Sequence, residues 1–72
     1  MDEKIVLRNR LKVARAEKNL SQAELALKAG VTRQTISTIE TGHYCPSTKL
    51  ALILAIELGK NFEELFYLEE VN

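Results

Sequence analysis

Apolar residues recur along most of the chain at the three- and four-residue spacing that places side chains on one face of an α-helix. The longest such pattern follows Pro46 and Ser47 and stops at Gly59. Its apolar positions on one face are Leu50, Ala51, Leu54, Ala55 and Leu58. The pattern predicts an amphipathic helix that packs this face against the rest of the chain.

Two shorter helices precede it, and capping residues mark their ends. Ser21 and Glu24 have the spacing of a capping box, and Gly30 supplies the left-handed residue with which many helices end. Thr32 is the N-cap of the next helix. Two capped helices joined by a short turn predict a helix-turn-helix motif over residues 21–41.

Both ends of the chain carry short runs whose periodicity fits more than one element. Asn9 is a cap for a first helix over residues 10–18, and residues 61–64 begin a short final helix. The runs at 4–7 and 65–70 are rich in apolar, β-branched and aromatic residues, and we predict two strands that pair antiparallel. A helical extension at each end is the alternative, because periodicity does not separate short runs.

The predicted fold is therefore all-α: a compact five-helix domain over residues 1–72, with a small two-stranded sheet formed by the chain termini. Cys45 is the single cysteine, so no internal disulfide forms, and we expect no metal site or cofactor. Cys45 is interpreted as a plain loop residue rather than a redox or metal sensor. A lone cysteine and the absence of a signal peptide favour a cytoplasmic protein, and the apolar run at 50–56 is too short to span a membrane.

The net charge of zero hides a polarised distribution. Residues 1–40 carry a net charge of +3 and residues 41–72 a net charge of −3. Such a chain can present a basic face to phosphate although its total charge is nil. The basic residues cluster early in the chain: Arg8, Arg10, Lys12, Arg15 and Lys18.

No pattern typical of an enzyme is present. His43 is the single histidine, without a nucleophile and an acid arranged around it, and the chain has neither a P-loop nor a glycine-rich cofactor turn. We expect no catalytic site and no small-molecule ligand.

The helix-turn-helix carries small and branched residues where the layout needs them. Ala26 allows close approach of the two helices, Gly30 makes the turn, and Ile36 and Ile39 fill the angle between the helices. The sequence of residues 20–26, 31–42 and 44–47 resembles the phage repressor and Cro-like (XRE-type) helix-turn-helix family, and most of all its small stand-alone bacterial and archaeal regulators. The resemblance covers about residues 9–66 and implies a lambda-repressor-like domain, with residues 33–41 as the recognition helix in the major groove.

The resemblance also assigns contacts to individual positions. Arg33, Gln34 and Thr38 match positions that face bases, with Ser37 beside them, whereas Gln22 matches a position that contacts the DNA backbone and braces the recognition helix. Arginine can bind guanine O6 and N7 together, and glutamine can bind adenine N6 and N7. Further backbone contacts are expected from Thr32, Thr35, Arg10, Lys12, His43, Tyr44 and Lys49. The family often has a lysine at the position of His43, so this contact would depend on pH.

Glu40 requires a cationic partner. It lies in the last turn of its helix, where a negative charge opposes the helix dipole. In the family, the arginine at the position of Arg15 pairs with the glutamate at the position of Glu40. We therefore predict a structural ion pair between the two rather than a phosphate contact by Arg15.

The fourth helix has a second apolar stripe. At 100° per residue, Leu52, Ile53 and Ile56 lie opposite the core face. Such a cluster indicates an interface, the alternative being that neighbouring helices or the terminal strands cover it. Together with Phe66, Tyr67 and Leu68, these residues are the candidate contacts of a homodimer.

The leading functional prediction is a transcriptional regulator, a repressor that binds a palindromic operator in double-stranded DNA as a homodimer without a cofactor, in the cytoplasm at the nucleoid. One alternative is the antitoxin of a toxin–antitoxin pair. Another is a protein-interaction module that does not bind DNA and uses the spare face of the fourth helix.

Overall fold

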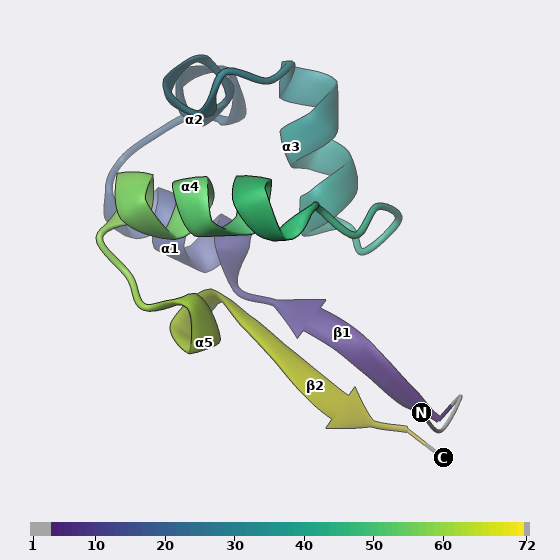
Figure 1. The fold of residues 1–72 in the computed structure, drawn as a ribbon. Helices are drawn as coiled ribbons and strands as arrows, with labels where there is room; N and C mark the ends of the chain where they lie inside the picture. The colour runs from purple at the N-terminus through teal and green to yellow at the C-terminus, as the bar shows by residue number, and fades with distance from the viewer. Residues whose placement is uncertain (1–3, 72) are drawn as a thin grey trace.

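The computed structural model describes residues 4–71, and the ends of the predicted domain range, residues 1–3 and 72, lie outside them. The described chain is mostly helical, with five helices and one two-stranded antiparallel sheet (Figure 1). In chain order the elements are β1 (Ile5–Asn9), α1 (Leu11–Glu17), α2 (Gln22–Ala29), α3 (Arg33–Glu40), α4 (Thr48–Leu58), α5 (Phe62–Leu65) and β2 (Phe66–Glu70).

The predicted caps form at the helix-turn-helix. The Ser21 hydroxyl accepts a hydrogen bond from the Glu24 amide at 3.0 Å, and the Glu24 carboxylate accepts one from the Ser21 amide at 2.8 Å. Gly30 ends α2 with φ at 74°, a left-handed conformation that suits glycine. Thr32 caps α3, which ends at Glu40, one residue earlier than predicted.

Helix α1 is shorter than the predicted range 10–18. Arg10 is not helical, with φ at −115° and ψ at 30°, because its amide donates to the carbonyl of Leu65 at 2.8 Å. Asn9 still serves the start of the helix, since its Oδ1 accepts from the Leu11 amide at 3.1 Å. The first helix therefore begins one residue later than predicted because Arg10 bonds to Leu65, which is distant in the sequence.

A strand near each terminus pairs with the other, so the helical extensions considered as an alternative are wrong. Strand β1 pairs antiparallel with β2, with Leu7 opposite Leu68 and Asn9 opposite Phe66. The strands are shifted from the predicted ranges 4–7 and 65–70, because Leu65 belongs to α5 and pairing continues to Asn9. The pair projects from the helices (Figure 1) and brings Ile5 beside Glu70, near the two ends of the described chain.

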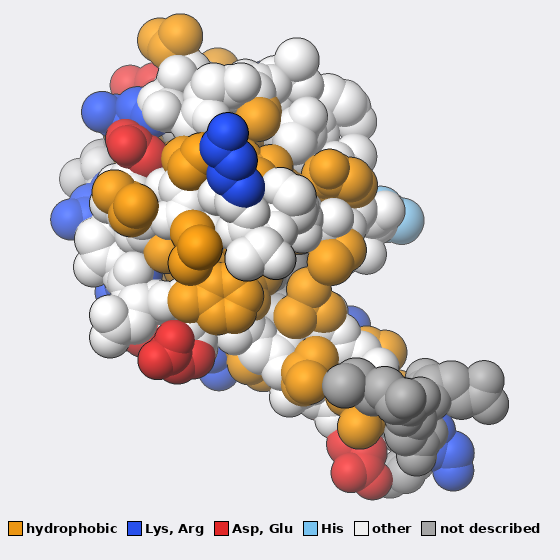
Figure 2. All heavy atoms as spheres, viewed as in Figure 1, with side chains coloured by type: hydrophobic (Ala, Val, Ile, Leu, Met, Phe, Trp, Pro, Cys, Tyr) orange, Lys and Arg blue, Asp and Glu red, His pale blue; other side chains and the backbone are white. Residues whose placement is uncertain are grey.

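The core lies between the helices and the base of the strand pair. Leu54 and Leu58 of α4 are fully buried, together with Ile36 of α3 and Leu25 of α2. Phe66 is 3% exposed and belongs to this core, which removes it from the surface available to a second copy. Hydrophobic side chains also reach the surface over α4 and along the strand pair (Figure 2).

None of the helices in residues 4–71 has the length and apolar content needed to cross a lipid bilayer.

Candidate nucleic-acid interface

Helix α3 buries one side and exposes the other. Ile36 and Ile39 are buried in the core. Helical periodicity places Gln34, Ser37 and Thr38 on the side away from them. Gln34 is exposed, and Ser37 and Thr38 are half-buried. The predicted base-contacting residues of this helix therefore lie together, with the exposed Arg33 in the first turn.

These side chains differ in whether their hydrogen-bond donors are free to bind a partner. The side chains of Arg33, Gln34 and Ser37 make no hydrogen bond or ion pair with any residue of 4–71. Their guanidinium, amide and hydroxyl groups are donors for a partner outside the chain. Thr38, in contrast, donates its hydroxyl to backbone carbonyls of its own helix.

Two further threonines, Thr32 and Thr35, lie at the start of α3. Thr32 Oγ1 accepts from the Thr35 amide at 3.2 Å, and the two hydroxyl oxygens lie 3.0 Å apart. Both residues are thus positioned at the N-terminus of α3, where a helix attracts anions. Their contact with the DNA backbone stays a prediction.

Glu40 is the point at which three helices are tied together. Arg15 of α1 donates to Glu40 Oε2 from Nε at 2.7 Å and to Oε1 from Nη2 at 3.2 Å. Gln22 of α2 donates to Oε1 at 3.0 Å, which braces α3 as the resemblance implies. Arg15 Nη1 also donates to the carbonyl of Leu20 at 2.8 Å. The negative charge in the last turn of α3 therefore has the cationic partner predicted for it.

Burial and hydrogen bonding act on Glu40 in opposite directions. Burial raises the pKa of its carboxyl, since the side chain is only 5% exposed. The hydrogen bonds from Arg15 and Gln22, with the charges of Arg15 and Lys12, outweigh burial and hold the pKa below its usual value. The same pairing raises the pKa of Arg15. Lys12 lies three residues before Arg15 in α1, so helical periodicity places the two on the same side of that helix.

The loop after α3 is fastened to the C-terminal turn of that helix. The amides of His43 and Tyr44 both donate to the carbonyl of Thr38, at 2.9 and 3.1 Å. Thr41 Oγ1 donates to the same carbonyl at 3.2 Å and lies 2.8 Å from His43 Nδ1. These bonds hold the side chain of His43 beside the C-terminal end of α3. Tyr44 and Lys49 are exposed, and their contacts with phosphate remain predictions.

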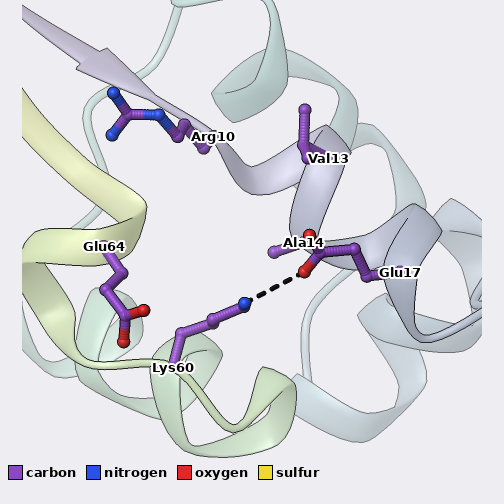
Figure 3. Close-up of a pocket in the computed structure, with 6 residues that line it drawn as sticks. All are labelled: Arg10, Val13, Ala14, Glu17, Lys60 and Glu64. Atoms are coloured by element: carbon purple, nitrogen blue, oxygen red, sulfur yellow. Dashed lines mark ion pairs between the residues drawn. The ribbon is translucent and has the colours of Figure 1, made fainter.

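Arg10, another predicted contact of the DNA backbone, lies beside β2. Its guanidinium sits 4.1 Å from the centre of the Tyr67 ring. It lines an open hollow of about 280 Å³ between α1 and α5, with Val13, Ala14, Glu17, Lys60 and Glu64 (Figure 3). Lys60 pairs with Glu17 across this hollow at 3.0 Å. No local pattern in the sequence predicts the hollow, because its walls come from separate helices.

Across residues 4–71, no group of three or more His, Cys, Asp or Glu side chains is placed to hold a metal ion. The thiol of Cys45 is exposed in the loop before α4.

Known proteins share both the sequence pattern and the geometry of this chain. A family model described as helix-turn-helix matches residues 11–65. The chain belongs to the helix-turn-helix family of transcriptional regulators. An uncharacterized HTH-type transcriptional regulator of Methanocaldococcus jannaschii is 48% identical over 64 residues, which is 89% of this chain and 97% of the relative. The HTH-type regulator YgzD of Bacillus subtilis is 42% identical over 92% of this chain and its own full length.

A solved structure agrees with these relatives. The restriction-modification controller protein C.AhdI from Aeromonas hydrophila matches with a TM-score of 0.72 and 34% identity. The match covers 76% of this chain and 80% of that one. The phage repressor and Cro-like resemblance seen in the sequence is therefore confirmed.

The helix-turn-helix chain also exposes an apolar face, which we define as the large side chains exposed on the strands, the loop, α4 and α5. These are Leu7, Tyr44, Leu52, Ile56, Phe62 and Leu68. Leu7 and Tyr44 line a small pocket with the buried Phe66, and the Phe66 ring stacks on Phe62 at 5.5 Å. The buried Phe66 thus lies beneath the strand, loop and α5 residues of this set, and Figure 2 shows hydrophobic side chains over α4 on the same side.

Of the predicted dimer contacts, Leu52, Ile56 and Leu68 are exposed, whereas Ile53 and Tyr67 are half-buried. Leu7, Tyr44 and Phe62 were not predicted as dimer contacts. Leu7 shares the face of Leu68 because the two lie opposite each other in the antiparallel pair, and this depends on a strand register that only the structure gives.

Proposed function

We propose that this helix-turn-helix chain is a repressor that inserts α3 into the major groove of a palindromic operator and binds as a homodimer. The observation that carries the proposal is the set of free donors on α3. The side chains of Arg33, Gln34 and Ser37 lie on the side of α3 away from the core, and none has a partner within residues 4–71. Each bidentate contact with the right base is worth about 1–3 kcal/mol of discrimination.

The contacts that hold α3 in place favour a role in base recognition over that of a surface helix that faces only solvent. Glu40, Arg15 and Gln22 lock the helix to α1 and α2 through a nearly buried network. A rigid helix loses little conformational freedom when it meets a partner, so more of its contact energy appears as affinity. The likeness to C.AhdI, a restriction-modification controller protein, also supports a regulatory role. The proposed site of action is the cytoplasm, with the operator in the nucleoid.

The test of base reading begins with selection of bound sequences from random DNA. Arg33→Ala and Gln34→Ala should each weaken binding to the selected operator by about 5- to 150-fold, the equivalent of 1–3 kcal/mol. They should also relax the base preference at one position in each half-site. Lys28→Ala, on the C-terminal turn of α2, is the matched control. Unchanged affinity in both variants would refute the assignment.

Dimerisation is proposed on the apolar face. With a net charge of zero, one recognition helix gains little from general attraction to phosphate, so a second copy one DNA turn away supplies the missing affinity. Six large exposed apolar side chains also need a partner surface.

The dimer is tested by comparing two exposed leucines. Leu68→Ser removes an apolar contact from the face, whereas Leu27→Ser changes an 84% exposed leucine on α2, outside it. Sedimentation equilibrium should show weaker association for Leu68→Ser alone. Equal association of the two variants would mean that the dimer interface does not include Leu68. Point substitution is preferable to truncation at Glu64, which would remove the buried Leu65 and Phe66.

The apolar face also favours a second candidate, a protein partner of another kind, as in an antitoxin or an interaction module. This candidate predicts a monomer in isolation. An antitoxin would still bind DNA, whereas an interaction module would show no binding that depends on salt.

A further inference from the structure

The hydroxyl group of Thr38 is already used inside α3. Its Oγ1 donates to the carbonyl oxygens of Gln34 and Thr35, each at 3.0 Å. A threonine hydroxyl has one hydrogen, so this shared bond takes up its whole donor capacity. Thr38 therefore has no donor left for a base edge.

With its hydroxyl hydrogen used inside the helix, Thr38 keeps its methyl group for an apolar contact with a partner. The side chain lies on the side of α3 away from the buried Ile36 and Ile39, and it is half-buried. Ser37, one residue earlier, keeps a hydroxyl with no partner in residues 4–71. Two neighbouring hydroxyl residues thus offer different chemistry: Ser37 offers a donor, and Thr38 offers an apolar methyl.

We infer that Thr38 reads the C5-methyl group of a thymine in the operator. In the major groove thymine is distinguished by this methyl, and the threonine methyl is one of the apolar groups that contact it. The inference rests on the proposed function, because it requires α3 in the groove. The competing role is acceptance of a hydrogen bond by Oγ1 from the amino group of adenine or cytosine.

The test uses the full chain and an operator selected from random DNA. Each thymine is replaced singly by deoxyuridine, which lacks only the methyl group. We expect one position in each half-site at which affinity falls about fourfold, the value of burying one methyl group. Thr38→Ser should lower affinity for the thymine operator by a similar factor and abolish the deoxyuridine effect. Thr38→Val, which keeps a methyl, should retain that effect.

Thr48→Ser is the matched control, because it removes a methyl from the first turn of α4, outside the recognition helix. It should keep both the affinity and the deoxyuridine effect. The inference is overturned if no thymine shows the deoxyuridine effect, or if that effect survives in Thr38→Ser. It is also overturned if Thr38→Val loses affinity for the operator while Thr38→Ser does not. Should Thr38→Val fail to fold, the wild type and Thr38→Ser decide the matter. Failure to select any DNA contradicts the proposed function, and the inference falls with it.

Discussion

At the residue scale, Glu40 shows how a single carboxylate can organise a recognition helix. Its two oxygens receive donors from α1 and α2, and its side chain is 5% exposed. A carboxylate removed from water in this way is tolerated because it is paired and hydrogen-bonded. The position of α3 therefore depends on Arg15 as well as on core packing.

Removal of Arg15 should cost more than removal of the Glu40 charge. Arg15→Met leaves a charged, nearly buried carboxylate, and we expect a loss of about 3 kcal/mol in the free energy of unfolding. Glu40→Gln should cost about 2 kcal/mol, because it weakens charge-assisted hydrogen bonds. Urea unfolding at pH 7 measures both.

Two controls accompany that comparison. The double variant should be no less stable than Arg15→Met alone, because the unpaired charge is gone. Arg8→Met breaks the pair with Glu69, in which both side chains are about half exposed, and should cost less than about 1 kcal/mol. Equal losses in Arg8→Met and Arg15→Met would show that the Glu40 network contributes no more to stability than an exposed ion pair.

The same carboxylate predicts a loss of stability in acid. The folded state holds the pKa of Glu40 below its ordinary value. The pair therefore stabilises the fold above the ordinary glutamate pKa of about 4.3, and this stabilisation is lost as the pH falls below it. Unfolding curves between pH 6 and pH 3 should show a shallower decline for Glu40→Gln than for the wild type. Parallel curves would mean that other carboxylates cause the decline.

At the scale of elements, Asn9 joins three of them at the end of β1. Its Oδ1 accepts from the Leu11 amide at the start of α1, and its Nδ2 donates to the carbonyl of Ile39 in α3 at 2.9 Å. The sequence predicts the first role from the cap position. The second depends on a residue 30 positions away and could not be predicted from local pattern.

Asn9→Ala should lower the free energy of unfolding by about 2 kcal/mol, because two partly buried hydrogen bonds are lost. Asn9→Asp keeps the acceptor for Leu11 but loses the donor and sets a negative charge beside a carbonyl of α3. It should also destabilise the protein, as measured by thermal unfolding. A gain in stability for Asn9→Asp would mean that the bond to Ile39 contributes little.

How well each element could be predicted follows from where its contacts lie. Helices α2, α3 and α4 are capped by Ser21, Thr32 and Ser47, whose hydroxyls accept hydrogen bonds from amides three residues on, so the sequence marks those starts. The bounds of α1 and both strands depend instead on distant partners, such as the carbonyl of Leu65 for the Arg10 amide. Within the site, periodicity predicts which side of α3 Gln34, Ser37 and Thr38 occupy. It cannot predict that the Thr38 hydroxyl turns back to the helix.

At the scale of the whole molecule, the polarised charge should set the salt dependence of DNA binding. Each phosphate neutralised adds about −0.9 to the slope of log affinity against log salt. Lys49→Ala should make the slope shallower by about one such step, whereas Lys28→Ala should leave it unchanged. Fluorescence anisotropy of a labelled operator at several salt concentrations measures this. Identical slopes in wild type and Lys49→Ala would remove Lys49 from the phosphate contacts.

The pairing of the two ends has a consequence for folding. Arg8 and Glu69 are 61 residues apart along the chain, whereas the capping contacts of α2, α3 and α4 span three. Closing so long a loop carries an entropic cost that the helices do not bear, so the strands should form after the helices and open before them. Leu7 and Leu68 become neighbours only when this last step is complete. A dimer built on their face would therefore be sensitive to heating well below the temperature at which the helices melt.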